Sequence, residues 1–365
     1  MVAILGPRQC GKTTLSHQFA ATQTKASVHF FDLEDPRDLA RLENPTLALE
    51  PLTGFIVIDE IQHMPELFPV LRVMADKKRD ARFLILGSAS PRLMKHSSET
   101  LAGRIAFLEL GGFSLDILKP EETRKLWMRG GFPRSFLARS EAASFEWREN
   151  FVRTYLERDI PNLGIQIPPR TLNRFWLMLS HYHGQLLNAS ELGKSFGAAD
   201  TTVRRYLDIL ASTYLIRQLQ PWYYNTKKRL IKRPKIFFRD SGIFHNLTGV
   251  ANFDQLHTHP KLGASWEGFA LEQVIQHLSL QEDEVFFWGV HTGADLDLVF
   301  QRNGKMWGVE IKYNEAPTRT KSMLSAIEEL SLKHLWVIFP GQGTYALDKK
   351  ISTVGINSLS DHLTL

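Results

Sequence analysis

The sequence is poor in cysteine, since Cys10 is the only one among 365 residues. No disulfide can form within the chain, which favours a reducing compartment. The sequence also has no apolar run of about eighteen residues and no basic segment followed by an apolar one near its start. These absences argue against a membrane span and a signal peptide, so we expect a cytoplasmic protein.

Neither sign of charge dominates the composition. The formal net charge is +5, with 43% hydrophobic and 23% charged residues, which is ordinary for a folded globular chain. The mild basic bias is compatible with nucleic-acid binding but does not establish it. At this length we expect about two to four domains.

The pattern G-x-x-x-x-G-K-T begins at Gly6 and follows the apolar run Val2–Leu5, which predicts a buried strand. Helical spacing follows it, so the glycines lie between a strand and a helix. This context predicts a phosphate-binding loop for ATP, in which backbone N–H groups surround the phosphates. The predicted nucleotide-binding residues are Gly6, Pro7, Arg8, Gln9, Cys10, Gly11, Lys12, Thr13 and Thr14.

Two of these residues have specific predicted roles. Lys12 is expected to reach the β and γ phosphates and to act in catalysis, and the Thr13 hydroxyl to bind Mg²⁺. Cys10 is expected to be a packing residue. Only five residues precede the loop, so the groups that hold the adenine are either missing from this sequence or lie elsewhere in it.

A second apolar run, Phe55–Ile58, ends in the carboxylates Asp59 and Glu60. This pattern predicts a central strand whose Asp59 helps to hold Mg²⁺ and binds the nucleotide through it. Glu60 would orient the attacking water and accept its proton, which favours ATP hydrolysis. Alternatively, the two acids begin a helix and face its positive end.

Two further residues complete the predicted ATPase site. Ser88 follows an apolar strand at 83–87 and would lie beside the γ phosphate, although it could equally cap a helix. Arg104 would stabilise charge on the transferred phosphoryl group, in the same chain or from a neighbouring one, unless it is an ordinary surface arginine. A strand at 105–110 then closes this domain.

The middle of the chain is predicted to be helical from 121 to 180, as in an ATPase lid, and then to form a helix-turn-helix over 188–216. Arg204 and Arg205 lie at the start of its second helix, the part that would face DNA bases. The hairpin-like segment 222–238 resembles a wing that contacts phosphates, and its cations are Lys227, Lys228, Arg229, Lys232, Arg233 and Lys235. The alternative is a module that binds only protein.

The last hundred residues place acids on predicted strands. A helix begins at Gly263 and strands follow at 285–288, 294–300 and 306–312. Asp297 lies within a strand, and Glu310 and Lys312 share a strand face, which is a nuclease-like constellation. Asp297, Glu310 and Glu267 would hold Mg²⁺ or Mn²⁺, with Lys312 activating water. Alternatively, Asp297 and Lys312 form a buried salt bridge without catalysis.

Together these motifs resemble a prokaryotic family of AAA-type P-loop ATPases with a winged helix and a C-terminal restriction-endonuclease-like domain. Further matching stretches are Gly103-Arg104, Gly130-Gly131-Phe132-Pro133, Arg158-Asp159 and Phe238–Gly242. The chain departs from the family in its short start and in Asp295, where a glutamate is expected. The resemblance implies an α/β protein with an ATPase core at 1–120, a helical lid and winged helix at 121–245, and a nuclease-like domain at 263–365.

The sequence therefore predicts an ATP-hydrolysing switch that associates with DNA and couples its nucleotide state to the winged helix and the nuclease-like domain. The alternative is a non-cleaving protein in which ATP controls binding of a protein partner through the winged helix or the C-terminal domain. Membrane association is not expected, and the oligomeric state stays open.

Overall fold

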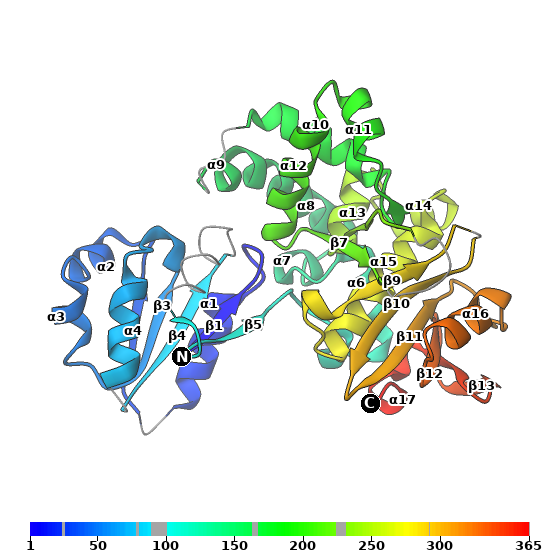
Figure 1. Ribbon diagram of the computed structural model, residues 1–365. Helices are drawn as coiled ribbons and strands as arrows, with labels where there is room; N and C mark the ends of the chain where they lie inside the picture. The colour runs from blue at the N-terminus through cyan, green and yellow to red at the C-terminus, as the bar shows by residue number, and fades with distance from the viewer. Residues whose placement is uncertain are drawn as a thin grey trace. The chain divides into compact units, whose positions relative to one another are not determined.

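The computed structural model describes residues 1–23, 26–77, 80–88, 101–162, 167–223, 231–291 and 293–364. The chain forms two compact units (Figure 1). The first comprises Met1–Gly112 and Asp208–Leu215, and the second comprises Phe113–Leu207 and Ile216–Leu365. Among the described residues, no helix combines the length and the apolar character needed to span a bilayer.

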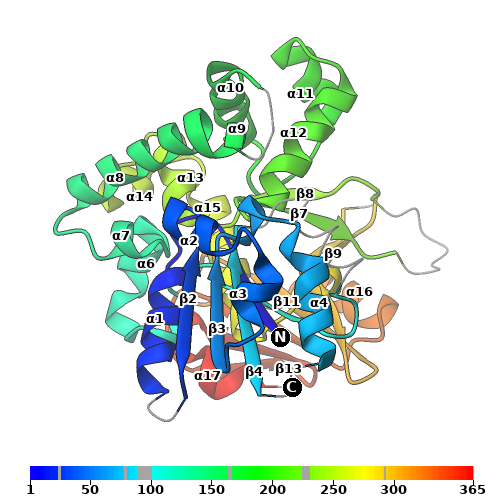
Figure 2. The same ribbon diagram turned by 90° about the vertical axis from the view of Figure 1, so that its left-hand side faces the viewer.

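The first unit is built on a five-stranded parallel sheet in the order β2-β3-β4-β1-β5. Figure 2 shows β2, β3 and β4 side by side. The inner strands are apolar because both of their faces are covered. The strands are β1 (Val2–Leu5), β2 (Val28–Asp32), β3 (Gly54–Asp59), β4 (Ala81–Gly87) and β5 (Ala106–Glu109).

Helices connect β1 to β2, β2 to β3 and β3 to β4, as parallel pairing requires. Asp35 caps the second described helix by accepting from the Arg37 backbone N–H, and Asn44 caps the third in the same way from Leu47. The helices are α1 (Lys12–Thr22), α2 (Pro36–Arg41), α3 (Pro45–Leu49) and α4 (Leu67–Lys77). The predicted strand and helix order of the ATPase core is thus confirmed.

The second unit begins with helices that the sequence predicts. Phe132, Phe136 and Tyr155 are almost fully buried among them. Their bounds are α6 (Thr123–Arg129), α7 (Pro133–Phe136), α8 (Glu141–Thr154), α9 (Ile160–Asn162) and α10 (Pro169–Ser180). Helices later in the chain include α13 (Ser241–Leu247), α14 (Phe253–Thr258), α15 (Leu262–His277), α16 (Lys321–Glu329) and α17 (Leu359–His362).

The predicted pair of helices after residue 188 is present. Asn188 caps α11 (Ala189–Phe196) by accepting from the Glu191 backbone N–H. Gly197, with φ of 78°, ends this helix in the left-handed conformation that glycine adopts easily. After this turn α12 (Asp200–Ser212) begins, and Asp200 is its first residue.

A mixed nine-stranded sheet runs through the second unit in the order β13-β14-β12-β11-β10-β9-β7-β8-β6. Its middle and C-terminal parts join where β7 pairs with β9, through Gln220 with Phe286 and Pro221 with Phe287. The strands are β6 (Gln185–Leu186), β7 (Ile216–Pro221), β8 (Lys235–Phe238), β9 (Phe286–Gly289), β10 (Asp295–Arg302), β11 (Lys305–Ile311), β12 (His334–Phe339), β13 (Thr344–Asp348) and β14 (Ile351–Gly355).

The two segments predicted as separate domains at 121–245 and 263–365 also share one hydrophobic core. Trp127 and Phe136 from the first segment belong to the same buried cluster as Trp266 and Phe269 from the second. The Trp127 and Trp266 rings meet edge to face with centroids 5.2 Å apart. The two segments therefore pack as one compact unit.

The stretch Gly130-Gly131 is tied to Asp240 within this unit. The Gly131 backbone N–H donates to Asp240 Oδ2 over 2.7 Å. Gly130 has φ of 76°, and a Cβ atom there would lie 2.1 Å from Asp240 Oδ1. Glycine is required at residue 130 by both backbone conformation and space.

Candidate functional site

The phosphate loop lies at the carboxyl end of β1, between this strand and α1. Gly6 has no space for a side chain, because a Cβ atom would lie 2.0 Å from the Leu110 carbonyl oxygen. Gly11, at the start of α1, has φ of 104°. The two glycines of the motif therefore allow the close approach and the turn that the predicted loop needs.

Lys12 lies over this loop. Its Nζ atom donates to the carbonyl oxygens of Gly6 at 3.1 Å and Pro7 at 2.8 Å. Cys10 is buried beside it, and burial raises the pKa of the Cys10 thiol. Cys10 is thus a packing residue, as expected, and its neutral thiol is a poor nucleophile.

The structure brings Thr13 and Asp59 together across the sheet edge. Thr13 Oγ1 donates to Asp59 Oδ2 over 2.5 Å. Burial raises the pKa of the Asp59 carboxyl, as does the nearby charge of Glu60, while the Thr13 hydrogen bond opposes the shift. A hydroxyl and a carboxylate in contact are the two protein groups that the sequence predicts for Mg²⁺. These residues fit the Mg²⁺ ion that the sequence predicts for this loop.

Glu60 is held directly after β3 with φ of 53°. Its carboxylate accepts a hydrogen bond from Gln62 Nε2, and its backbone N–H donates to Asp59 Oδ1 at 2.8 Å. A single 3-10 turn follows Glu60, but the Glu60 side chain does not cap it. Glu60 thus directly precedes a short 3-10 helix, as the alternative interpretation expects, but its side chain contacts Gln62, a residue that the sequence analysis does not single out.

Ser88 follows β4 and is buried. Because Leu5 pairs with Gly87, Ser88 lies level with Gly6 at the edge of the sheet that carries the phosphate loop. Arg8 lies on the same loop and forms an ion pair with Glu34, which follows β2. Gln9 and Thr14 are exposed on this loop and the first turn of α1.

The structure contradicts the role predicted for Arg104. Ala106, at the start of β5, pairs with Val2, so Arg104 lies at the amino ends of these strands. The phosphate loop follows Leu5 at their opposite ends. Arg104 forms a bidentate ion pair with Asp76, with N–O distances of 2.6 and 3.0 Å. The prediction that Arg104 reaches the phosphate site of its own chain is wrong.

In the second unit, the predicted acids gather on one face of the sheet. Asp297 and Glu310 lie opposite each other, one residue beyond the Leu298–Val309 pair of β10 and β11. The Ile311 backbone N–H donates to Asp297 Oδ2 at 2.9 Å. Lys312 Nζ lies 2.5 Å from Glu310 Oε1, so these two predicted neighbours are in contact.

The partner of Asp297 is Lys235, not Lys312 as the salt-bridge alternative predicts. Lys235 Nζ lies 3.3 Å from Asp297 Oδ1, 3.6 Å from Glu267 Oε1 and 3.9 Å from Asp295 Oδ2. Lys235 is only 8% exposed, which contradicts its predicted place on a phosphate-binding wing. We refer to Lys235, Glu267, Asp295, Asp297, Glu310 and Lys312 as the carboxylate cluster.

Burial and mutual repulsion shift the pKa values in this cluster. Burial and the Asp297 charge raise the pKa of Glu267 to about 8 and that of Glu310 to about 8. Burial alone would lower the pKa of Lys235, but the carboxylates of Asp297, Glu267 and Asp295 outweigh it and raise the value. The cluster thus favours a charged Lys235 and disfavours charge on both glutamates.

The predicted metal site does not fit this arrangement. Among the described residues, no group of three or more His, Cys, Asp or Glu side chains is placed to hold a metal ion. The Lys235 ammonium lies among the carboxylates that the sequence assigns to Mg²⁺ or Mn²⁺. Asp297 and Glu267 contact Lys235, whereas Glu310, which lies opposite Asp297 on the neighbouring strand, contacts Lys312.

The predicted DNA-binding residues are only partly described. Arg204 is exposed at the start of α12 and lies 3.7 Å from Asp200, and Arg205 beside it is also exposed. Lys232 and Arg233 are exposed immediately before β8. Lys227, Lys228 and Arg229 lie outside the described residues.

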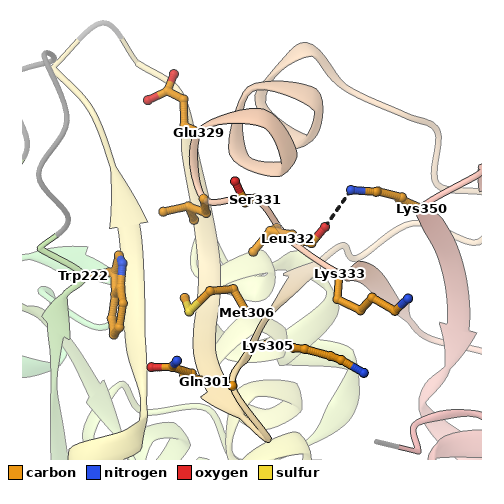
Figure 3. Close-up of a pocket in the computed structure, with 11 residues that line it drawn as sticks. Trp222, Gln301, Lys305, Met306, Glu329, Ser331, Leu332, Lys333 and Lys350 are labelled. Carbon is orange, nitrogen blue, oxygen red and sulfur yellow. Dashed lines mark hydrogen bonds between the residues drawn. The ribbon is translucent and has the colours of Figure 1, made fainter.

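The second unit also contains a cavity of about 450 Å³ away from these acids. Trp222 and Met306 contribute apolar surface to it, and Lys350 Nζ donates to the Leu332 carbonyl oxygen at 3.0 Å (Figure 3). The cavity is formed by residues from β10, β11 and the segment after α16. It contains none of the predicted catalytic residues.

A parallel sheet with a glycine-rich loop before α1, and a Thr-Asp contact at its edge, defines a P-loop domain. Residues 1–118 match the family model of an AAA domain. Residues 120–254 and 262–359 match two models described as domains of unknown function, DUF8612 and DUF4143.

Two proteins are similar over 355 residues at 45% identity: the uncharacterized proteins Rv2008c of Mycobacterium tuberculosis and Mb2031c of Mycobacterium bovis. Each alignment covers 97% of this chain and 79% of the relative. The chain therefore belongs to the same family as these mycobacterial proteins. In this chain, the AAA domain precedes the two domains of unknown function.

Similarities to solved structures are weak. A RuvB variant of Thermotoga maritima is 17% identical, with 60% of this chain and 81% of that chain covered and a TM-score of 0.29. Drosophila ORC bound to GC-rich DNA and Cdc6 is 8% identical, with 69% and 86% covered and a TM-score of 0.25. These scores are too low to support a conclusion about this chain.

Proposed function

We propose that the protein is an ATP-binding and ATP-hydrolysing switch. The observation that carries this proposal is the contact of Thr13 with Asp59 beside Lys12 at the edge of the first sheet. The Lys12 ammonium is directed at neutral carbonyl oxygens of the loop, and an anionic phosphate would be a stronger partner for it. Thr13 and Asp59 would hold Mg²⁺, which supplies charge stabilisation for the transferred phosphoryl group.

Glu60 is the proposed general base. Gln62 donates to its carboxylate and so restrains the side chain, while Asp59 accepts from the Glu60 backbone N–H. In this arrangement Asp59 remains available to the ion and Glu60 to water. Ser88, buried level with Gly6, is the proposed residue that responds to the γ phosphate.

The nucleotide site is tested by Lys12→Ala, with Lys77→Ala in the same unit as a matched control. Lys12→Ala should abolish binding of a fluorescent ATP analogue, because it removes the cation of the loop. Lys77 is exposed at the end of α4 and its variant should bind normally. Equal affinity of the two variants would remove Lys12 from the site.

DNA association is the second part of the proposal. The helix pair α11 and α12, followed by the antiparallel strands β7 and β8, supports a winged helix-turn-helix, and Arg204 and Arg205 are exposed where base contacts would form. Replacing Lys232 and Arg233 by Ala should weaken binding to unrelated DNA sequences and reduce the salt slope by about one unit per lost phosphate contact. Arg204→Ala should mainly relax sequence preference.

Phosphate release measured with and without DNA tests whether ATP hydrolysis is coupled to DNA association. Stimulation by DNA would support the coupled switch. Hydrolysis that DNA does not alter would favour the alternative function, in which ATP controls binding of a protein partner. Lys235 among the carboxylates favours a C-terminal domain that docks rather than cleaves, because the proposed metal ligands already surround a cation.

A further inference from the structure

The carboxylate cluster contains four acids and two lysines, which leaves two excess negative charges if every group is ionised. Asp297 and Glu310 come from neighbouring strands, Glu267 from α15, and Lys235 from β8. Isolated charges in such a place are costly, so each needs a counter-charge or a proton. Lys235 and Lys312 supply two of the four counter-charges, and the raised pKa values of Glu267 and Glu310 favour a proton on each of these two glutamates.

Lys235 satisfies this requirement only in part. Its Nζ atom approaches three carboxylates, while the remaining acid, Glu310, faces Asp297 across the strand pair and contacts Lys312 Nζ through Oε1. Glu310 is 4% exposed, and within the described part of the chain its Oε2 atom has no hydrogen-bond partner. Among the described residues, the two lysines therefore leave this buried carboxylate oxygen of the cluster without a hydrogen-bond partner, beside the oxygens that surround Lys235.

We infer that Lys235 is the resident cation of the carboxylate cluster and that the cluster binds a divalent metal ion only when the Lys235 ammonium is removed. The wild-type cluster is then an internal ion-pair network that connects β8 to β10 and α15. Removing the positive charge leaves Asp297, Glu267 and Asp295 with oxygens directed at one point. Hard divalent ions such as Mn²⁺ and Mg²⁺ prefer oxygen ligands of this kind.

The test uses the full chain without nucleotide, with Mn²⁺ as the probe. All eight tryptophans lie in the second unit, so the tryptophan emission of a thermal melt reports this unit and not the phosphate loop. Wild-type protein should show no Mn²⁺-dependent rise in the melting temperature. Lys235→Met should bind Mn²⁺ at least tenfold more tightly by electron paramagnetic resonance and melt higher with it.

Two further variants are matched controls. Lys349→Met removes an exposed lysine that lies outside both the carboxylate cluster and the proposed DNA-binding residues, and this variant should match the wild type in Mn²⁺ affinity and in the effect of Mn²⁺ on melting. Adding Asp297→Asn to Lys235→Met should cancel the gain, because it removes a ligand. A Lys235→Met protein that folds but binds Mn²⁺ no better than the wild type would overturn the inference.

If Lys235→Met does not fold, melting of the wild-type protein with and without Mn²⁺ still tests whether Lys235 occupies the cation position of the carboxylate cluster. The inference is wrong if Mn²⁺ raises the melting temperature of the second unit in the full wild-type chain and Asp297→Asn abolishes this rise. Lys235 would then not occupy the cation position. No rise in the wild type, with Asp297→Asn melting lower in the presence and absence of Mn²⁺, supports the ion-pair network.

Discussion

Two buried histidines should make the second unit sensitive to acid. His183 Nδ1 accepts from the Phe238 backbone N–H at 3.0 Å, and its Nε2 lies 3.1 Å from the Ala264 carbonyl oxygen. His245 Nδ1 lies 3.0 Å from the Met128 carbonyl oxygen, and its Nε2 lies 2.7 Å from Ser265 Oγ. Each neutral ring thus has partners for both nitrogens.

Burial lowers the pKa of both His183 and His245 to about 3. In the unfolded chain a histidine has a pKa of about 6.5. Between these values the unfolded state binds more protons, so stability is full above pH 6.5 and falls as the pH falls. At pH 5, about 1.5 units below the unfolded value, each histidine should cost about 2 kcal/mol of unfolding free energy.

The assay is urea unfolding followed by tryptophan emission at pH 7 and pH 5. His245→Asn should be less stable at pH 7, because it disturbs the bond to Ser265, but should lose about 2 kcal/mol less than the wild type on acidification. His362→Asn, at an exposed histidine, is the control and should keep the wild-type difference. An unchanged pH difference in both His183→Asn and His245→Asn would refute the reasoning.

Three other substitutions test particular contacts. Glu272→Gln should lower the stability of the second unit by about 3–5 kcal/mol in urea melts, because it removes the charge that pairs with buried Arg217; a change below about 1 kcal/mol would contradict this. Gly130→Ala should destabilise the same unit and reduce soluble yield, because its Cβ atom meets Asp240, and a wild-type melting temperature would show that the loop adapts. Arg104→Ala should leave ATP turnover unchanged, and loss of turnover would indicate that Arg104 acts on a neighbouring chain.

The part of the candidate site formed by residues adjacent in the sequence can be predicted from the sequence alone. The phosphate loop from Gly6 to Thr13 is continuous, and its strand and helix were predicted correctly because apolar runs and capping residues are local signals. Asp59 follows an apolar strand in a pattern that predicts a Mg²⁺ ligand, and Thr13 is predicted to bind the same ion, so their contact is expected. Arg104 could also have been placed, since it precedes its strand and so lies at the amino edge of the sheet.

Lys235 shows what a local pattern misses. It belongs to a run of cations, which normally indicates an exposed surface, and its partner Asp297 is 62 residues away. The apolar residues Ile236–Phe238 after it were the available signal of burial. The pairing of β7 with β9, which joins the middle and C-terminal segments, likewise depends on long-range contacts that no single segment encodes.

The most direct measurement of the central proposal is single-turnover phosphate release by Glu60→Gln beside the wild type, with ATP affinity measured on the same samples. The substitution keeps the shape of the side chain but removes the proposed base, so affinity should stay within about twofold while release falls by about 10²–10⁴-fold. Release at the wild-type rate, with ATP bound, would contradict the assignment of Glu60 as the group that activates water.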